Sequence, residues 1–289
     1  MKQSQSHILN VRGLRYHVRT WGDSAHPQLW LLHGWMDVSA SFQFVVDALD
    51  GDWHVIAPDW RGFGLSQWAE GGYWFLDYLA DLDVLLGLLA QDSRVDLVGH
   101  SMGGNAANLY AGVRPDRIRR LALLEGFGLP RTVPGDAPDR IGRWLDQIAD
   151  PPSFKPYASF TEVEERLMQN NPRLTPDKAR FLAPHWAKRA DSGEMVLASD
   201  PAHKMLHPVL YRLEEALACW RRISAPVLWV WGDGEWMRKW FKTGEDDLAE
   251  RRAAIRNLTE VRLEDCGHMM HHDQPEKLAR VLEDFFTRP

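Results

Sequence analysis

Short apolar runs alternate with longer stretches of helical periodicity in the first 130 residues of the chain. The runs have the length of buried strands and lie at 29–32, 54–58, 95–98 and 120–124. Between them, leucines recur at helical spacing over 75–91, and further helices are predicted at 40–49 and 105–113. Continuous apolar strands that alternate with helices predict a parallel sheet covered on both faces.

The two ends of the chain extend this pattern. Residues 14–21 alternate between apolar and polar positions, which predicts an edge strand or a hairpin. Apolar strands return at 226–232 and 260–263, with a charged helix over 245–257 between them. An apolar stripe over 278–286 predicts a terminal helix that packs on the core.

Residues 130–213 break the alternation. This stretch is rich in proline, charge and helical patterning, contains no convincing strand, and carries scattered aromatic side chains such as Trp144. We interpret it as a helical cap, or lid, inserted into an α/β core. The core domain then comprises residues 1–129 and 214–289.

Composition is that of an ordinary globular chain. Of the 289 residues, 45% are hydrophobic and 26% are charged, and the formal net charge of −6 excludes a basic nucleic-acid-binding surface. No apolar run approaches the length of a membrane span, and the N-terminal residues lack the apolar core of a secretory signal, so we expect a cytoplasmic protein. The 14 tryptophans predict aromatic-lined surfaces, some of them around a binding cavity.

The candidate chemistry begins at Gly99-x-Ser101-x-Gly103, between an expected strand and an expected helix. This pattern is typical of a sharp strand-to-helix turn that presents a serine hydroxyl. Glycines flank the serine because side chains at those positions would collide with neighbouring backbone in so tight a turn. The helix that follows directs its N-terminal N–H groups at charge that develops near the hydroxyl. Ser101 is therefore the candidate nucleophile.

A serine hydroxyl needs a base at neutral pH, and His268 is the best candidate. His268 follows the last predicted strand by a short loop, at the sheet edge where open α/β sheets bind ligands. The base in turn needs a carboxylate on its other ring nitrogen. Glu125 is favoured, because a carboxylate at the end of an apolar strand is expected to be partly buried and to need a partner. Glu235 is the alternative acid, and Asp233 is a third choice.

Two backbone N–H groups are candidates for the oxyanion hole. One belongs to Met102, directly after the nucleophile, and the other to Trp35, in the loop after the strand at 29–32. The side chains of Trp35, His100 and Trp144 are the candidate substrate contacts. No metal and no cofactor are expected to take part in this chemistry.

With these residues placed, the chain resembles the α/β-hydrolase fold superfamily over essentially its whole length, and within it the serine hydrolase-like esterases. The resemblance rests on five ordered motifs. These are His33-Gly34-Trp35, the segment 59–66 (DWRGFGLS), the segment 99–104 (GHSMGG), the segment 124–130 (LEGFGLP) and Gly267-His268. It implies an eight-stranded, mostly parallel sheet flanked by helices, a helical cap after the sixth strand, and a Ser–acid–His triad.

The resemblance bears on the acid and on the reaction. Most members carry the acid, usually an Asp, after the seventh strand. In this chain Glu235 holds that position. Some haloalkane dehalogenases instead carry a Glu after the sixth strand, where Glu125 falls. Those enzymes and the epoxide hydrolases use Asp where Ser101 stands, so their chemistry is not expected here.

The sequence thus predicts a serine hydrolase that cleaves a carboxylic ester, thioester or lactone through an acyl-enzyme. The expected partner is a small, ester-like molecule with an apolar or aromatic group, and the chain is expected to act as a monomer or homodimer. A C–C bond hydrolase and a perhydrolase are alternatives with similar motifs. A receptor that binds a small ligand with little turnover is the alternative from another class of protein.

Overall fold

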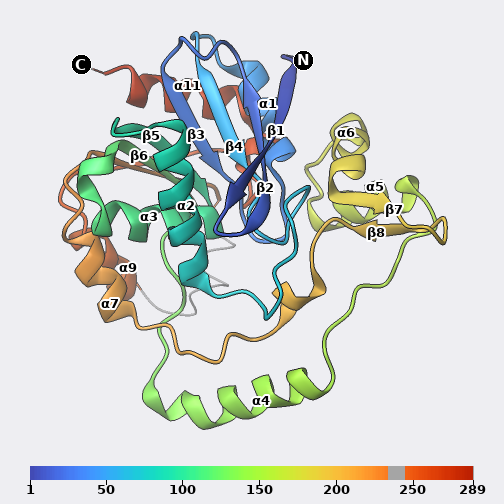
Figure 1. Cartoon of the computed structure of the whole chain (residues 1–289). Coiled ribbons are helices and arrows are strands. Elements are labelled where there is room, and N and C mark those ends of the chain that lie inside the picture. The colour runs from blue at the N-terminus through green and yellow to red at the C-terminus, as the bar shows by residue number, and fades with distance from the viewer. Residues whose placement is uncertain (234–244, 289) are drawn as a thin grey trace.

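The computed structural model describes residues 1–233 and 245–288 (Figure 1). Its centre is an eight-stranded sheet in the order β1-β2-β4-β3-β5-β6-β9-β10, in which only β2 runs against the others. The strands are β1 (Ser4–Val11), β2 (Leu14–Trp21), β3 (Gln28–Leu32), β4 (His54–Pro58), β5 (Val95–His100), β6 (Ile118–Leu124), β9 (Val227–Trp231) and β10 (Leu258–Arg262). The predicted mostly parallel, eight-stranded sheet is confirmed.

The N-terminal hairpin forms one edge of this sheet. The pattern at 14–21 corresponds to β2, and the polar β1 before it is the edge strand. Arg12 and Gly13 connect the two strands with φ of 50° and 85°, the backbone region that a tight two-residue hairpin turn requires. The largely polar sequence of β1 suits an edge strand, most of which is exposed to solvent.

Helices cover both faces of the sheet. On one face lie α2 (Phe75–Leu89), α3 (Met102–Val113), α7 (Leu213–Trp220) and α9 (Glu245–Ala253), and on the other α1 (Gln43–Ala48), α10 (Met270–Asp273) and α11 (Pro275–Phe286). Successive strand residues serve different cores: Trp30 packs with α2 and α3, whereas Leu31 packs with α1 and α11. Among the described helices, none is long and apolar enough to cross a membrane.

The chain leaves the sheet between β6 and β9. It forms η3 (Pro134–Asp136), α4 (Ala137–Ala149), α5 (Phe160–Asn170), α6 (Pro176–Trp186), β7 (Ala187–Arg189), β8 (Met195–Leu197) and η4 (Pro201–Lys204). The segment α5 to β8 encloses its own apolar cluster, which includes Val163 and Leu182. Helix α4 has no buried residue and lies apart from the sheet, along the lower rim in Figure 1.

The prediction that residues 130–213 contain no strand is wrong. Strands β7 and β8 pair antiparallel in a small hairpin, closed by a turn that contains Gly193 with φ of 91°. Strands this short show no readable alternation of apolar and polar positions, so the sequence pattern could not reveal them.

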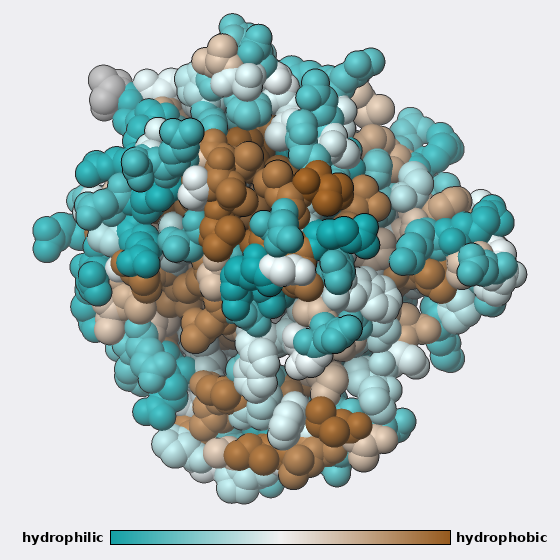
Figure 2. All heavy atoms as spheres, viewed as in Figure 1, coloured by the Kyte–Doolittle hydropathy of each residue, from teal (hydrophilic) through white to brown (hydrophobic). Residues whose placement is uncertain are grey.

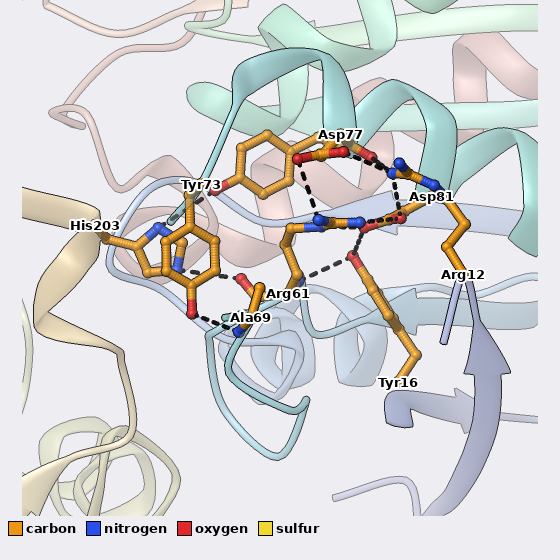
Figure 3. A network of polar contacts seen from close by, with 9 residues as sticks. Arg12, Tyr16, Arg61, Ala69, Tyr73, Asp77, Asp81 and His203 are labelled. Carbon is orange, nitrogen blue, oxygen red and sulfur yellow. Dashed lines mark hydrogen bonds and ion pairs between the residues drawn. The ribbon is translucent and has the colours of Figure 1, made fainter. Parts of the chain in front are cut away.

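A network of polar side chains holds the loop after β4 in place (Figure 3). Arg61 of this loop forms two hydrogen-bonded ion contacts of 2.6 Å with the buried carboxylate of Asp81 on α2. The hydroxyl of Tyr16 donates to Asp81 at 3.0 Å and accepts the backbone N–H of Arg61 at 2.9 Å. Because the buried charges are paired and hydrogen-bonded, the network fixes the loop without leaving an unpaired charge.

The same loop contacts the segment between β6 and β9 through His203 of η4. The His203 ring stacks between Phe63 and Tyr73, with centroid distances of 3.8 Å and 3.6 Å. Its Nε2 lies 3.1 Å from the backbone oxygen of Arg61 (Figure 3). Burial lowers the pKa of His203 to about 3, so the ring is neutral and stacks as an aromatic group. His203 thus links η4 to the loop after β4.

Candidate active site

The turn between β5 and α3 presents Ser101 at the carboxyl end of the sheet. Ser101 has φ of 52° and ψ of −114°, a conformation that is rare for a residue with a side chain. A Cβ on Gly99 would lie 2.5 Å from the Gly103 oxygen, and one on Gly103 would lie 2.3 Å from the Leu32 oxygen. The backbone is therefore packed so closely that glycine is required at both positions, which explains the motif physically.

Three strand-end loops bring Ser101, His268 and Glu125 together. The Nε2 atom of His268 lies 3.0 Å from Ser101 Oγ. Its Nδ1 atom lies 3.1 Å from Glu125 Oε2. These loops follow β5, β10 and β6, which all end at the same edge of the sheet. The geometry is that of a nucleophile, a base and an orienting carboxylate in a hydrogen-bonded row.

Glu125 is held in this row by backbone. It is 4% exposed and has φ of 52°, and its second oxygen, Oε1, accepts the N–H of Gly232 at 2.8 Å. Of the other two candidate acids, Asp233 accepts a hydrogen bond at Oδ2 from the Arg173 guanidinium, with the two atoms 3.1 Å apart, and Glu235 falls outside the described residues. Among the candidates that the structure describes, Glu125 is the carboxylate beside His268.

The loop that contains Trp35 lies against the nucleophile. A Cβ on Gly34 would be 3.2 Å from Ser101 Cβ, so the backbone of this loop passes close to the serine. Met102 begins α3, where the first N–H groups of a helix have no partner within the helix. The Trp35 side chain is half exposed, and its indole N–H donates to the His203 oxygen at 3.2 Å.

The three side chains expected to contact the substrate lie in different parts of the structure. Trp35 lines an apolar cavity of about 590 Å³, which lies between α2, α3 and the segment 202–212. His100 lies in the core, 1% exposed, with Nε2 2.8 Å from the backbone oxygen of His268. Trp144 is half-buried on α4 and does not line the cavity. Of the three, only Trp35 borders this space.

Apolar side chains are exposed around the mouth of this cavity. Trp74, Leu76 and Val209 line it and are 44%, 69% and 60% exposed. Further apolar atoms gather on the lower part of the face in Figure 2, where α4 lies. The cavity is therefore suited to an apolar group.

The structure also shows a buried arginine that the sequence pattern did not reveal. Arg251 of α9 is fully buried, and its guanidinium donates to the backbone oxygens of Phe127 and Leu129 at 2.9 Å each. These contacts fix the segment that follows Glu125. An arginine in a charged helix shows no sequence signal for this role, because the carbonyl groups that it binds belong to a distant loop.

Cys266, two residues before His268, is not a competing nucleophile. Its side chain is buried, and burial, followed by the negative charges of Asp273 and Glu125, raises the pKa of the thiol to about 12. The thiol is therefore protonated at neutral pH. Both cysteines are free.

A mostly parallel sheet with a serine turn, a histidine loop and a carboxylate at one edge is the architecture of the α/β hydrolases. The family model for the alpha/beta hydrolase fold matches residues 27–275, and the chain belongs to this family. It is therefore a hydrolase.

Two curated relatives extend over most of the chain. It is 27% identical over 276 residues to a serine hydrolase-like protein of Danio rerio, with 92% of this chain and 83% of the relative covered. It is 30% identical over 288 residues to a 3-hydroxybutyrate-oligomer hydrolase of Cupriavidus necator, with 95% and 92% covered. Among solved structures, the thioesterase domain from the curacin biosynthetic pathway superposes with a TM-score of 0.84 at 25% identity, over 97% of this chain and 99% of that one.

Proposed function

We propose that this protein hydrolyses carboxylic esters or thioesters through a covalent acyl-Ser101 intermediate. The observation that carries the proposal is the row Ser101–His268–Glu125, with separations of 3.0 Å and 3.1 Å. A serine within hydrogen-bond reach of an oriented imidazole is the arrangement that activates a hydroxyl for attack on a carbonyl.

In the first half of the reaction, Ser101 Oγ attacks the carbonyl carbon and His268 Nε2 takes its proton. Glu125 stabilises the resulting imidazolium through Nδ1 and keeps the ring in the required tautomer. The N–H of Gly232 holds Glu125 in turn. The N–H groups of Met102 and Trp35 stabilise the oxyanion, and His268 returns the proton to the departing alcohol or thiol.

In the second half, a water molecule replaces the departed group. His268 takes a proton from this water, whose oxygen attacks the acyl carbon, and the acid product leaves as the proton returns to Ser101 Oγ. Every proton transfer uses the same nitrogen, and no cofactor is needed for the balance of atoms.

Two of the comparisons support an ester or thioester substrate. One relative is named as a hydrolase of 3-hydroxybutyrate oligomers, and hydroxy acids join to each other through esters. A solved neighbour is a thioesterase domain. The apolar cavity that Trp35 lines, although Ser101 and His268 do not line it, would suit an apolar acyl or aryl group of the substrate. We further propose that residues 130–213 act as the lid over this site.

Labelling with a fluorophosphonate probe tests the proposal. We expect one probe per chain by intact mass, and no labelling of Ser101→Ala, because only an activated serine reacts with the probe. Assays with aryl esters and acyl thioesters of rising chain length should then show turnover. A folded protein that does not label contradicts the proposal and favours the low-turnover receptor. Cleavage of a C–C bond in a diketone into two products, without ester turnover, would support the C–C hydrolase.

A further inference from the structure

A second group of side chains with the chemistry of a binding site lies behind the nucleophile. Asp37, His100 and His271 are 2%, 1% and 0% exposed. One possible ligand atom of each lies within 4.8 Å of those of the other two. These residues come from the loop after β3, the end of β5 and α10, so three separate segments converge there. The group has no role in the proposed reaction.

The ring of His100 has a free lone pair. Its Nε2 lies 2.8 Å from the backbone oxygen of His268, and because a carbonyl only accepts, Nε2 carries the hydrogen. The Nδ1 atom is then unprotonated, and it has no hydrogen-bond partner among the described residues. A Cβ on Gly34 would lie 2.9 Å from Nδ1, so this nitrogen lies close to the backbone of the loop that carries Asp37. Histidines that bind metal ions commonly donate their other N–H to a backbone carbonyl in this way.

Asp37 also has an oxygen to offer. Its Oδ1 accepts the N–H of Val38 at 2.9 Å, whereas the buried Oδ2 has no hydrogen-bond partner within the described ranges. Oδ2 lies 3.4 Å from His271 Nε2. This is close to the separation of two ligand atoms that each lie about 2.1 Å from a tetrahedral cation. Oδ2 and His271 Nε2 are thus paired with each other, and a cation between them would replace this contact and balance the buried carboxylate.

We propose that Asp37, His100 and His271 form a binding site for a divalent transition cation of the zinc type. Two imidazole nitrogens and one carboxylate oxygen are a ligand set that such cations prefer. The hydroxyl of Ser41 lies 2.5 Å from His272 Nε2 and 3.3 Å from His271 Nε2, and with its hydrogen directed to His272 the oxygen keeps a lone pair for a fourth position. The ligand atoms lie up to 4.8 Å apart, so the longest separation must shorten by about 1.4 Å to reach that of a tetrahedral cation.

The cation would be structural. It joins the loop after β3, the end of β5 and α10, and through His100 it acts on the backbone of His268. It therefore fixes the turn that contains Ser101 relative to the loop that contains His268, without touching the reacting atoms. The sequence predicts that no metal takes part in the reaction. A structural cation at this site agrees with that prediction and leaves the proposed mechanism unchanged.

Metal content tests the proposal directly. Full-length protein refolded with zinc sulphate and then dialysed should retain about one zinc per chain by mass spectrometry. Cobalt loaded in the same way should show the visible absorption of a bound, low-symmetry ion. We expect Asp37→Asn and His271→Gln, each confirmed as folded by circular dichroism, to lose at least nine-tenths of the retained metal. His7→Gln, a variant of an exposed histidine, should retain it and serves as the matched control.

Thermal unfolding gives a second readout that does not depend on activity. Zinc should raise the unfolding temperature of the wild type and of His7→Gln by several degrees. It should not change the unfolding temperature of Asp37→Asn or His271→Gln. Two results overturn the proposal. One is folded wild-type protein that retains no zinc or cobalt after refolding with the metal. The other is metal retained by Asp37→Asn and His271→Gln but lost from His268→Gln, which would place the cation on the triad.

Discussion

At the scale of single residues, two strained positions organise the site. Ser101 and Glu125 each follow the last residue of a strand, and both have φ of 52°, which costs free energy for residues with side chains. In return, Ser101 Oγ and Glu125 Oε2 lie on opposite nitrogens of His268. The surrounding backbone holds both: the Ser101 N–H donates to the Leu124 oxygen at 2.8 Å, and the Glu125 N–H donates to the Val230 oxygen at 3.0 Å.

The role of Glu125 leads to a test by one isosteric change. Glu125→Gln should lower kcat for ester hydrolysis by about 10⁴-fold, because an amide no longer stabilises the imidazolium and favours the wrong tautomer of His268. Glu235→Gln is the control and should keep kcat within a few-fold of the wild type. Steady-state kinetics with an aryl ester decide between them. The reverse pattern would reassign the acid to Glu235.

At the scale of elements, glycine positions determine how closely β5 and α3 approach their neighbours. The turn that joins them admits no Cβ at Gly99 or Gly103. A Cβ on Gly104 would lie 2.8 Å from the Gly126 Cα. By contrast, Gly87 in α2 is exposed, and a Cβ there meets nothing within 4 Å. The same residue type is therefore required in one helix start and dispensable in another helix.

This contrast predicts opposite effects of one substitution. Gly103→Ala should lower the free energy of unfolding by about 1–3 kcal/mol or more, because the new methyl group collides with the backbone of β3. Gly87→Ala should raise it by up to about 1 kcal/mol, because alanine favours the helix. Urea unfolding followed by circular dichroism measures both. Equal stability of Gly103→Ala and wild type would show that the turn is less tightly packed than described.

At the scale of the whole molecule, the segment between β6 and β9 has two kinds of attachment. Part of it is anchored, since His203 stacks on Phe63 and Tyr73, and Asp200 accepts the hydroxyl of Tyr73 at 2.8 Å. Helix α4 is different, because none of its residues is buried. The anchored part lies against the loop after β4, which the Arg61–Asp81 pair fixes to α2.

Removal of the anchor should loosen the segment without unfolding the sheet. His203→Ala should speed amide hydrogen exchange over residues 198–207 by roughly tenfold, since two aromatic contacts of about 0.5–1.5 kcal/mol each are lost. Exchange in β3, β5 and β6 should stay the same. Arg180→Ala, an exposed position on α6, is the control and should change neither region. Uniformly faster exchange across the sheet would mean that His203 stabilises the entire domain.

The sequence by itself determined the features that depend on local pattern. Buried strands show as continuous apolar runs, and the Gly99-x-Ser101-x-Gly103 turn shows because its steric demands allow so few residue types. The position of His268 after the last strand also follows from chain order. For these reasons the alternation of strands and helices, and the meeting of Ser101 with His268, could be predicted.

Only the tertiary structure decided which distant groups meet. Glu125 lies beside His268 because β6, β9 and β10 are neighbours in the sheet, which also brings the Gly232 N–H to the carboxylate. The burial of Arg251, the strands β7 and β8, and the convergence of Asp37, His100 and His271 depend in the same way on contacts between segments far apart in the chain. Local periodicity carries no record of such contacts, because the partners lie outside any sequence window.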